Sequence, residues 1–151
     1  MIRWTLVFVI ALFVGFLVYV DINNDRPETL GVTDGVLMPC PASPNCVSSQ
    51  ALRTDEAHYV APIVITGDIN GTQLKLEKFF LDQEYSNVIS SELGYFHVEV
   101  KSPFFGYIDD IEFYWPESDS VIHVRSASRV GYSDMNVNRE RVEAVRSAFI
   151  E

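Results

Sequence analysis

The residues best suited to specific chemistry are arginines close to the C-terminus. Between Asp55 and Ser120 the chain carries thirteen acidic and three basic residues, but this balance reverses after Val121. An arginine guanidinium is planar and binds a carboxylate or a phosphate group through two parallel hydrogen bonds. The basic residues of this segment therefore suit either an ion-pair network or an anion site; they are Arg125, Arg129, Arg139, Arg141 and Arg146.

Two arrangements of these arginines are open. In the first, Arg125 lies on the polar face of a strand whose neighbour presents Asp110 and Glu112, and cross-strand ion pairs form without any ligand. In the second, Arg129 and the loop of residues 131–138 meet at the start of a helix, where free backbone N–H groups attract an anion. An acidic lipid headgroup or a carboxylate of a partner protein would fit the second arrangement. The candidate residues for anion or partner binding are Arg125, Ser126, Ser128, Arg129, Asp134, Asn138, Arg139, Asp109, Asp110 and Glu112.

The chain offers no arrangement of residues that identifies a catalytic centre. A serine hydrolase would use Ser126 or Ser128 with His123 and Asp134, but the chain lacks the Gly-x-Ser-x-Gly sequence that positions a nucleophilic serine. His123 and Ser126 would also point to opposite faces of one strand. The histidines do not show metal-ligand spacing, and there is no glycine-rich phosphate loop or dinucleotide fingerprint. We therefore expect no catalytic residue, no metal and no cofactor.

The two cysteines, Cys40 and Cys46, are separated by five residues that include two prolines. This spacing favours a short disulfide loop in an oxidising compartment. A zinc site would need about four ligands, and no histidine lies near the two thiols. A redox-active pair would more often be Cys-x-x-Cys beside a helix start. These two kinds of site, and a pair of free thiols, are the alternatives to a structural disulfide.

An apolar segment at the N-terminus is long enough to cross a membrane. Residues 4–20 contain no charged side chain, and a helix of this length spans about 26 Å, close to a hydrocarbon core of ~30 Å. Trp4 and Tyr19 suit the two headgroup boundaries. Because Arg3 precedes the segment and Asp21 follows it, we expect the N-terminus in the cytosol and the C-terminal part outside it. A cleaved signal peptide is the alternative, although the apolar run is longer than usual and no small-residue cleavage site precedes Asp21.

These features predict a bacterial inner-membrane protein with a periplasmic C-terminal domain. We expect an anchor of residues 1–20, a linker of residues 21–39 that tethers the domain, and one globular domain of residues 40–151. The expected partners are the membrane, through residues 4–20, and either a protein or an anionic ligand. The net charge of -10 argues against nucleic acid, because phosphate binding needs a basic surface.

Hydrophobic residues follow two periods along the domain, which predicts an α+β fold. Apolar residues at helical spacing mark one amphipathic helix within residues 72–83 and a second near the C-terminus, capped by Asp134, Asn136 or Asn138. A turn of residues 67–71 precedes the first helix. Alternating or β-branched segments predict strands over residues 58–65, 88–91, 95–101, 110–115 and 121–127. We expect an antiparallel sheet of four or five strands with two helices on one face, preceded by one transmembrane helix.

Three sequence blocks resemble domain-of-unknown-function family 1499. They are Cys40-Pro-Ala-Ser-Pro-Asn-Cys46 with the following Val-Ser-Ser, Gly106-Tyr-Ile-Asp-Asp-Ile-Glu112, and Arg125-Ser-Ala-Ser-Arg-Val-Gly-Tyr-Ser-Asp134 with Asn138-Arg139-x-Arg141. The blocks occur in the family's order, and the resemblance extends over residues 39–149. One departure is Asn136, where the family's loop is expected to have Gly, but Asn also adopts the left-handed conformation. The family has no assigned activity, so the resemblance implies only that the three blocks belong to one site or one scaffold.

The leading expectation is a non-enzymatic, single-pass envelope protein that binds or assists a partner at the outer face of the inner membrane. It would use its acidic surface or its arginines. The alternative is a membrane-tethered enzyme that acts on an anionic small molecule or lipid, with Asp109, Asp110 or Glu112 as the acid or base. A deep pocket that unites Asp110, Arg125 and Arg129 would favour the enzyme. Mutual pairing of these residues at a flat surface would favour the binding role.

Overall fold

The fold is α+β, as the two hydrophobic periods predicted. The computed structural model describes residues 2–65, 68–116 and 120–150. Three helices and eight strands follow one another along these residues: α1 (Ile2–Ile22), β1 (Val32–Thr33), β2 (Val36–Leu37), β3 (Cys46–Ser48), β4 (Ile63–Val64), α2 (Ile69–Leu81), β5 (Ser86–Glu92), β6 (Tyr95–Lys101), β7 (Ile108–Tyr114), β8 (Val121–Ser128) and α3 (Val137–Ile150).

The main sheet is antiparallel and has the order β3-β8-β7-β6-β5, with β4 also paired to β8. β5 and β6 form a hairpin with Leu93 and Gly94 in its turn, and Gly94 has the positive φ of 91° that favours glycine. The sheet has six strands rather than four or five. The added strand is β3, which pairs with β8 and is too short to show a sequence period. The strand predicted over residues 58–65 is present only as β4, Ile63–Val64.

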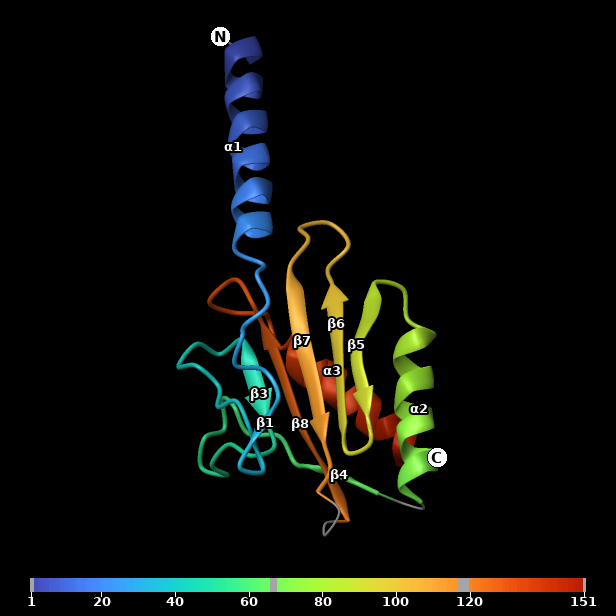
Figure 1. Ribbon diagram of the computed structural model, residues 1–151. Coiled ribbons are helices and arrows are strands. Elements are labelled where there is room, and N and C mark those ends of the chain that lie inside the picture. The colour runs from blue at the N-terminus through green and yellow to red at the C-terminus, as the bar shows by residue number, and fades with distance from the viewer. Residues whose placement is uncertain (1, 66–67, 117–119, 151) are drawn as a thin grey trace.

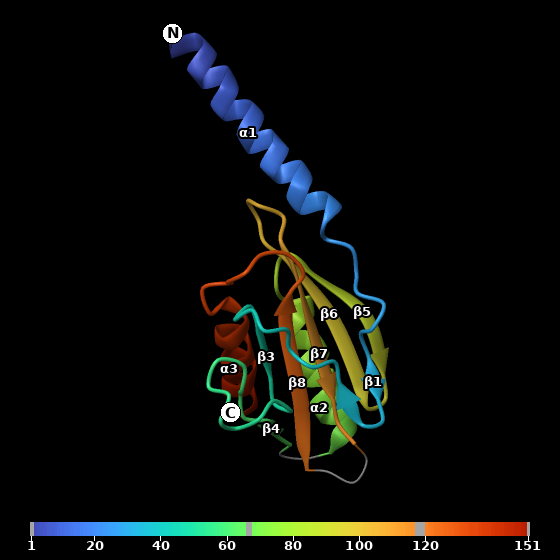
Figure 2. The ribbon, with the colours of Figure 1, turned by 90° about the vertical axis from the view of Figure 1, so that its left-hand side faces the viewer.

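Both helices of the domain cover one face of this sheet (Figures 1 and 2). The hydrophobic core lies between the sheet and these two helices. It includes Phe80 of α2, Phe113 of β7 and Val145 of α3, all fully buried. The predicted turn of residues 67–71 is wrong in part, because α2 begins at Ile69. Asp68 ends the turn and accepts a hydrogen bond from the Gly71 N–H, so it caps the helix. Gly67 lies outside the described residues.

The N-terminal helix α1 extends away from the domain (Figure 1). It is long and apolar enough to cross a membrane, a property that a signal sequence near the N-terminus shares. Nearly all of its side chains are exposed, but Val20 in its last turn is buried. The ring of Phe16 meets the rings of Phe105 and Tyr107 edge-on at centroid distances of 6.0 and 6.3 Å. The C-terminal end of α1 is therefore in contact with the loop that joins β6 to β7.

Residues 23–39, here called the strap, run from α1 along the face of the sheet that the helices leave open (Figures 1 and 2). The Asn24 side-chain amide donates a hydrogen bond to the Gly106 carbonyl at 2.7 Å and accepts one from the Ile108 N–H at 3.2 Å. Farther along, β1 and β2 form a two-residue-per-strand hairpin. The division into anchor, linker and domain stays a prediction, but the segment expected to be a tether is hydrogen-bonded to the domain.

Candidate functional site

A layer of charged side chains lies between the sheet and the strap. In β6, β7 and β8 alternate residues point away from the helices, and the strand register places Glu99 opposite Asp110 and Glu112 opposite Arg125. His97, Asp110, Glu112 and Arg125 are at most 3% exposed, although all four side chains are polar or ionisable. The name "charged layer" is used below for Arg26, His97, Glu99, Asp110, Glu112, Arg125 and Arg129.

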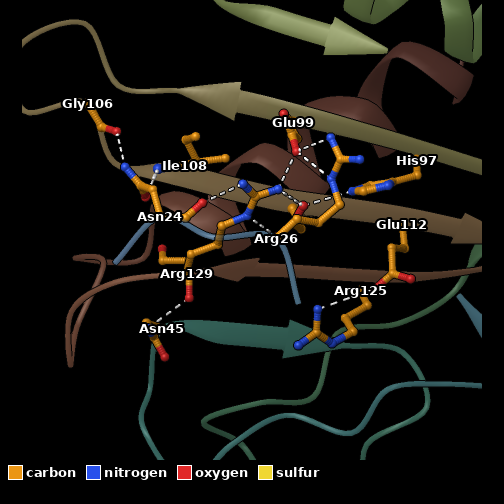
Figure 3. Close-up of polar contacts among 12 residues, drawn as sticks. Asn24, Arg26, Asn45, His97, Glu99, Gly106, Ile108, Glu112, Arg125 and Arg129 are labelled. Atoms are coloured by element: carbon orange, nitrogen blue, oxygen red, sulfur yellow. Dashed lines mark hydrogen bonds and ion pairs between the residues drawn. The ribbon is translucent and has the colours of Figure 1, made fainter. Parts of the chain in front are cut away.

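Arg129 is the centre of this layer (Figure 3). Its Nε and Nη2 donate to the two carboxylate oxygens of Asp110 at 2.7 and 2.8 Å. Its Nη2 also pairs with Glu99, and its Nη1 donates to the Asn24 carbonyl of the strap at 2.8 Å. Arg26 of the strap donates to the same Glu99 oxygen from the solvent side, at 2.7 and 2.9 Å. The guanidinium of Arg129 therefore joins two strands of the sheet to the strap.

Glu112 holds a second part of the layer together. Its Oε1 accepts hydrogen bonds from the Tyr95 hydroxyl at 2.9 Å and from the Gly31 N–H of the strap at 2.6 Å. Its Oε2 is 3.4 Å from Nη1 of Arg125, a long contact for an ion pair. The Arg125 Nε is buried and has no hydrogen-bond partner among the described residues. Fewer of the guanidinium N–H donors of Arg125 are therefore hydrogen-bonded than those of Arg129.

The pKa shifts of Asp110 and Glu99 favour the ionised form of both carboxylates. Burial alone would raise the pKa of Asp110, but hydrogen bonds from Arg129 and His97 outweigh it and keep the pKa below its ordinary value of 3.8. Burial would likewise raise the pKa of Glu99, and the hydrogen bonds from Arg129 and Arg26 reverse that effect. An acid or base in catalysis usually needs a pKa near the working pH, so the shift of Asp110 is in the wrong direction for that role.

A cavity lies between the strap and the layer. It has a volume of about 280 Å³ and is lined by strap residues Pro27, Met38 and Pro39, by Asp110 and Arg125 of the sheet, and by Arg129, which follows β8. Burial lowers the pKa of Arg125, opposed by the charges of Glu112 and Asp110, yet an arginine remains protonated at neutral pH. The cavity thus unites the three residues that would favour an enzyme, but two of them, Asp110 and Arg129, are bound to each other.

The other half of the predicted site faces α3, on the opposite side of the sheet. Ser126 donates to the buried side chain of Asn138, whose amide nitrogen donates to the Ser128 hydroxyl at 3.1 Å. Arg141 donates to the same Asn138 at 2.9 Å and to Asp109 at 2.8 Å. The Arg-Ser-x-Ser-Arg sequence is therefore split by strand alternation: its arginines enter the charged layer and its serines bind α3.

The remaining candidate residues hold other segments in place. Asp134 accepts hydrogen bonds from the N–H groups of Asn136 and Asn138, so it caps α3, as one of the three predicted candidates. Asn136 has a φ of 69°, the conformation for which the family's loop was expected to use Gly. Arg139 donates to three backbone carbonyls of residues 56–59. None of these contacts joins Arg139 to the other arginines.

A hydrolase built from Ser126 is excluded by these positions. Ser126 faces α3, whereas the Nδ1 of His123 lies 3.3 Å from the hydroxyl of Ser49. The two residues point to opposite faces of β8, as predicted. Within residues 2–65, 68–116 and 120–150, no group of three or more His, Cys, Asp and Glu side chains is arranged to hold a metal ion.

The two cysteines form the predicted disulfide, with the sulfur atoms of Cys40 and Cys46 2.02 Å apart. The bridge joins the end of the strap to β3, an edge strand of the sheet. The Asn45 amide donates to the carbonyls of Ser128 and Gly131, at 3.3 and 2.8 Å. This block of the sequence therefore fastens the strap and the loop after β8 to the same strand.

Four residues of the charged layer and its surroundings were not among the candidates. His97 and Glu99 lie on the polar face of β6, and their alternation with Phe96 and Val98 was a signal that could have found them. Asn24 and Arg26 belong to the strap, which shows no period. Their pairing with Arg129 and Glu99 depends on contacts between residues more than seventy positions apart.

One family matches this sequence. It is described as "Protein of unknown function (DUF1499)", and the match covers residues 36–149, which include all three sequence blocks. It is the family that those blocks resemble. No curated protein and no solved structure matches the chain.

Proposed function

This chain belongs to the DUF1499 family, and we propose that it is a single-pass envelope protein whose C-terminal domain is a non-enzymatic binding or assembly module. α1 would cross the inner membrane of a bacterium with its N-terminus in the cytosol, and the domain would lie at the periplasmic face. The apolar helix and the disulfide support this proposal, because disulfides persist in oxidising compartments.

The observation that carries the non-enzymatic role is the occupancy of the charged layer. Asp110 accepts hydrogen bonds from Arg129 and His97 through both carboxylate oxygens, and Glu112 is bound by Tyr95 and Gly31. A general base must be able to reach a substrate proton, and these oxygens are buried and occupied by protein donors. Binding would then use the acidic outer surface of the domain, since Arg125 and Arg129 are buried.

The location is tested by expressing the full chain with a C-terminal tag in a bacterial host. The proposal expects the tag in the membrane fraction after alkaline extraction, with residues 1–22 retained in the mature protein. External protease should remove the tag only after the outer membrane is opened. A shortened, soluble periplasmic product would show that α1 is a signal peptide, and a tag that stays protected would show the opposite orientation.

One observation favours a second function, a membrane-tethered enzyme or receptor for an anionic small molecule or lipid. The cavity beside Arg125 opens to solvent, and within the part of the chain that the structure describes the buried Nε of this arginine has no hydrogen-bond partner. A carboxylate or phosphate group bound there could satisfy this donor.

The two functions are separated by thermal unfolding of the full chain in detergent, with phosphate, citrate and glycerol 3-phosphate as probes. The non-enzymatic role expects no shift of the midpoint with any of the three. A shift in the wild type that is lost in Arg125→Met would establish the anion site. Arg146→Met serves as the matched control, because Arg146 pairs with Glu143 on α3, away from the cavity.

A further inference from the structure

The end of the domain nearest to α1 carries exposed apolar side chains on two loops. The β6–β7 loop, residues 102–107, presents Phe104 and Phe105, which are 85% and 47% exposed. The β8–α3 loop, residues 129–136, presents Tyr132 and Met135, which are 75% and 88% exposed. Figures 1 and 2 show both loops at the end of the sheet from which α1 extends.

The contact between α1 and the first loop sets the depth of that loop. Phe16 contacts Phe105 and Tyr107, and it precedes the buried Val20 by four residues. Four helical residues correspond to about 6 Å along the helix axis. If α1 crosses a bilayer, its apolar segment ends at Val20, at the membrane surface. A ring that contacts Phe16 then lies one helical turn inside that surface. Phe105 then cannot remain in bulk water.

The second loop is continuous with the first through an apolar groove. The groove has a volume of about 360 Å³, and its apolar lining includes Phe16 of α1, Phe105 and Tyr107 of the first loop, and Val130 and Met135 of the second. Asp109 and Asp134 also line it, but their carboxylates accept hydrogen bonds from Arg141 and from the Asn138 N–H. It joins the anchor and both loops into one apolar surface. A contiguous exposed apolar surface of this kind marks a site of interaction with a protein or a membrane.

The charges of the two loops fit a lipid surface. Their charged residues are Arg129 and Asp134, and both are engaged within the domain, in the charged layer and at the start of α3. Exposed aromatic side chains favour the headgroup boundary, where an apolar ring meets water. A protein with a net charge of -10 would gain little from anionic lipids. Attachment would therefore depend on apolar insertion rather than on lipid charge.

We propose that residues 102–107 and 129–136 dock on the bilayer that α1 crosses, with Phe104, Phe105, Tyr132 and Met135 inserted at the headgroup boundary. The domain then lies against the membrane instead of standing away from it. This inference rests on the proposed function, because it takes α1 as the membrane anchor.

The test uses the full chain in phosphatidylcholine nanodiscs with one environment-sensitive fluorophore at a time. Both native cysteines are in a disulfide, so a single introduced cysteine can be labelled at Phe104→Cys, Met135→Cys or Val9→Cys in α1. Leu93→Cys is the matched control, since Leu93 is 73% exposed and lies in the β5–β6 turn at the opposite end of the sheet. Quenching by a nitroxide on the upper part of the lipid acyl chain, within reach of both the headgroup boundary and position 9, and by aqueous iodide is measured at each position.

Docking expects the lipid nitroxide to quench the labels at positions 104, 135 and 9, and iodide to quench only the label at position 93. Replacing a third of the phosphatidylcholine by phosphatidylglycerol should leave this pattern unchanged. If iodide quenches positions 104 and 135 as strongly as position 93, docking is wrong and the apolar surface is left for a protein partner, while quenching at position 9 still supports the anchor. If position 9 alone escapes the lipid nitroxide, the anchor is wrong and the loops bind lipid independently.

Discussion

Replacing Arg129 by methionine should destabilise the domain far more than the same change at Arg26. Both guanidinium groups pair with the same carboxylate oxygen of Glu99, but the side chain of Arg129 is 5% exposed and that of Arg26 is 48% exposed. Arg129→Met leaves buried Asp110 without its two strongest donors, and removing one partner of a buried pair costs about 3–5 kcal/mol. Arg26→Met breaks a half-exposed pair, which contributes about 0–1 kcal/mol.

Chemical unfolding of the full chain in detergent would measure this difference. Trp115 is 3% exposed and serves as the fluorescence probe, in a Trp4→Phe background that removes the other tryptophan. Arg129→Met also removes the bond to the Asn24 carbonyl. Hydrogen exchange of the strap amides should therefore rise in this variant and stay nearly unchanged in Arg26→Met.

A double-mutant cycle checks the cause. If the loss in Arg129→Met comes from an unpaired carboxylate, adding Asp110→Asn should recover part of it, with a coupling of about 0.5–3 kcal/mol. Equal losses in Arg129→Met and Arg26→Met, or strictly additive effects with Asp110→Asn, would refute the reasoning. Either result would mean that water, rather than Arg129, compensates the buried charge of Asp110.

Three further predictions concern other parts of the fold. The pKa values of Asp110 and Glu99 are lowered in the folded protein, so their contribution to stability is complete above about pH 5 and is lost as the pH falls through the folded pKa values. The free energy of unfolding should therefore change less between pH 3 and pH 7 in Asp110→Asn than in the wild type. An unchanged pH profile in the variant would contradict this. Cys46→Ser should lower the free energy of unfolding by about 2 kcal/mol on the loop-entropy model, and a reducing agent should lower that of the wild type equally without affecting the variant. Asn138→Ala should cost about 1–3 kcal/mol in the same unfolding assay, since the amide is fully buried and hydrogen-bonded; the exposed Asn87 is the control position, and an equal loss in Asn87→Ala would contradict the assignment.

The sheet and its two faces were predictable because one face is buried against helices. In β6 the alternation of Phe96 and Val98 with His97 and Glu99 identifies both the core face and the polar face. The same alternation in β7 and β8 predicts that Arg125 and Glu112 are neighbours, and the strand register confirms this. These predictions depend only on the two-residue period of a strand.

The strap was not predictable by the same means. Its residues bind through single side chains and backbone groups, such as Gly31 to Glu112, which follow no period. The same limit explains why β3 was missed, since a strand of three residues is too short to show alternation. The second arrangement considered for Arg129, beside the start of α3, required its side chain to point toward the helices. The structure instead bonds Arg129 to Asp110 and Glu99, on the opposite face.

Holding the strap through buried ion pairs is unfavourable in desolvation free energy, because each charged group must lose its bound water. Apolar side chains could hold the strap with similar free energy, but a strand-like segment on an apolar surface can slide along it. Arg129 reaches the carbonyl of Asn24 and Glu112 reaches the N–H of Gly31, so the strap is bound at two defined residues. The Asn24 side chain in turn donates to the loop that contacts α1, which means that the position of the strap sets the position of α1 relative to the domain. The ion pairs would then serve less to stabilise the domain than to fix its position relative to α1. The hydrogen exchange of the strap amides in Arg129→Met is the measurement on which that argument depends.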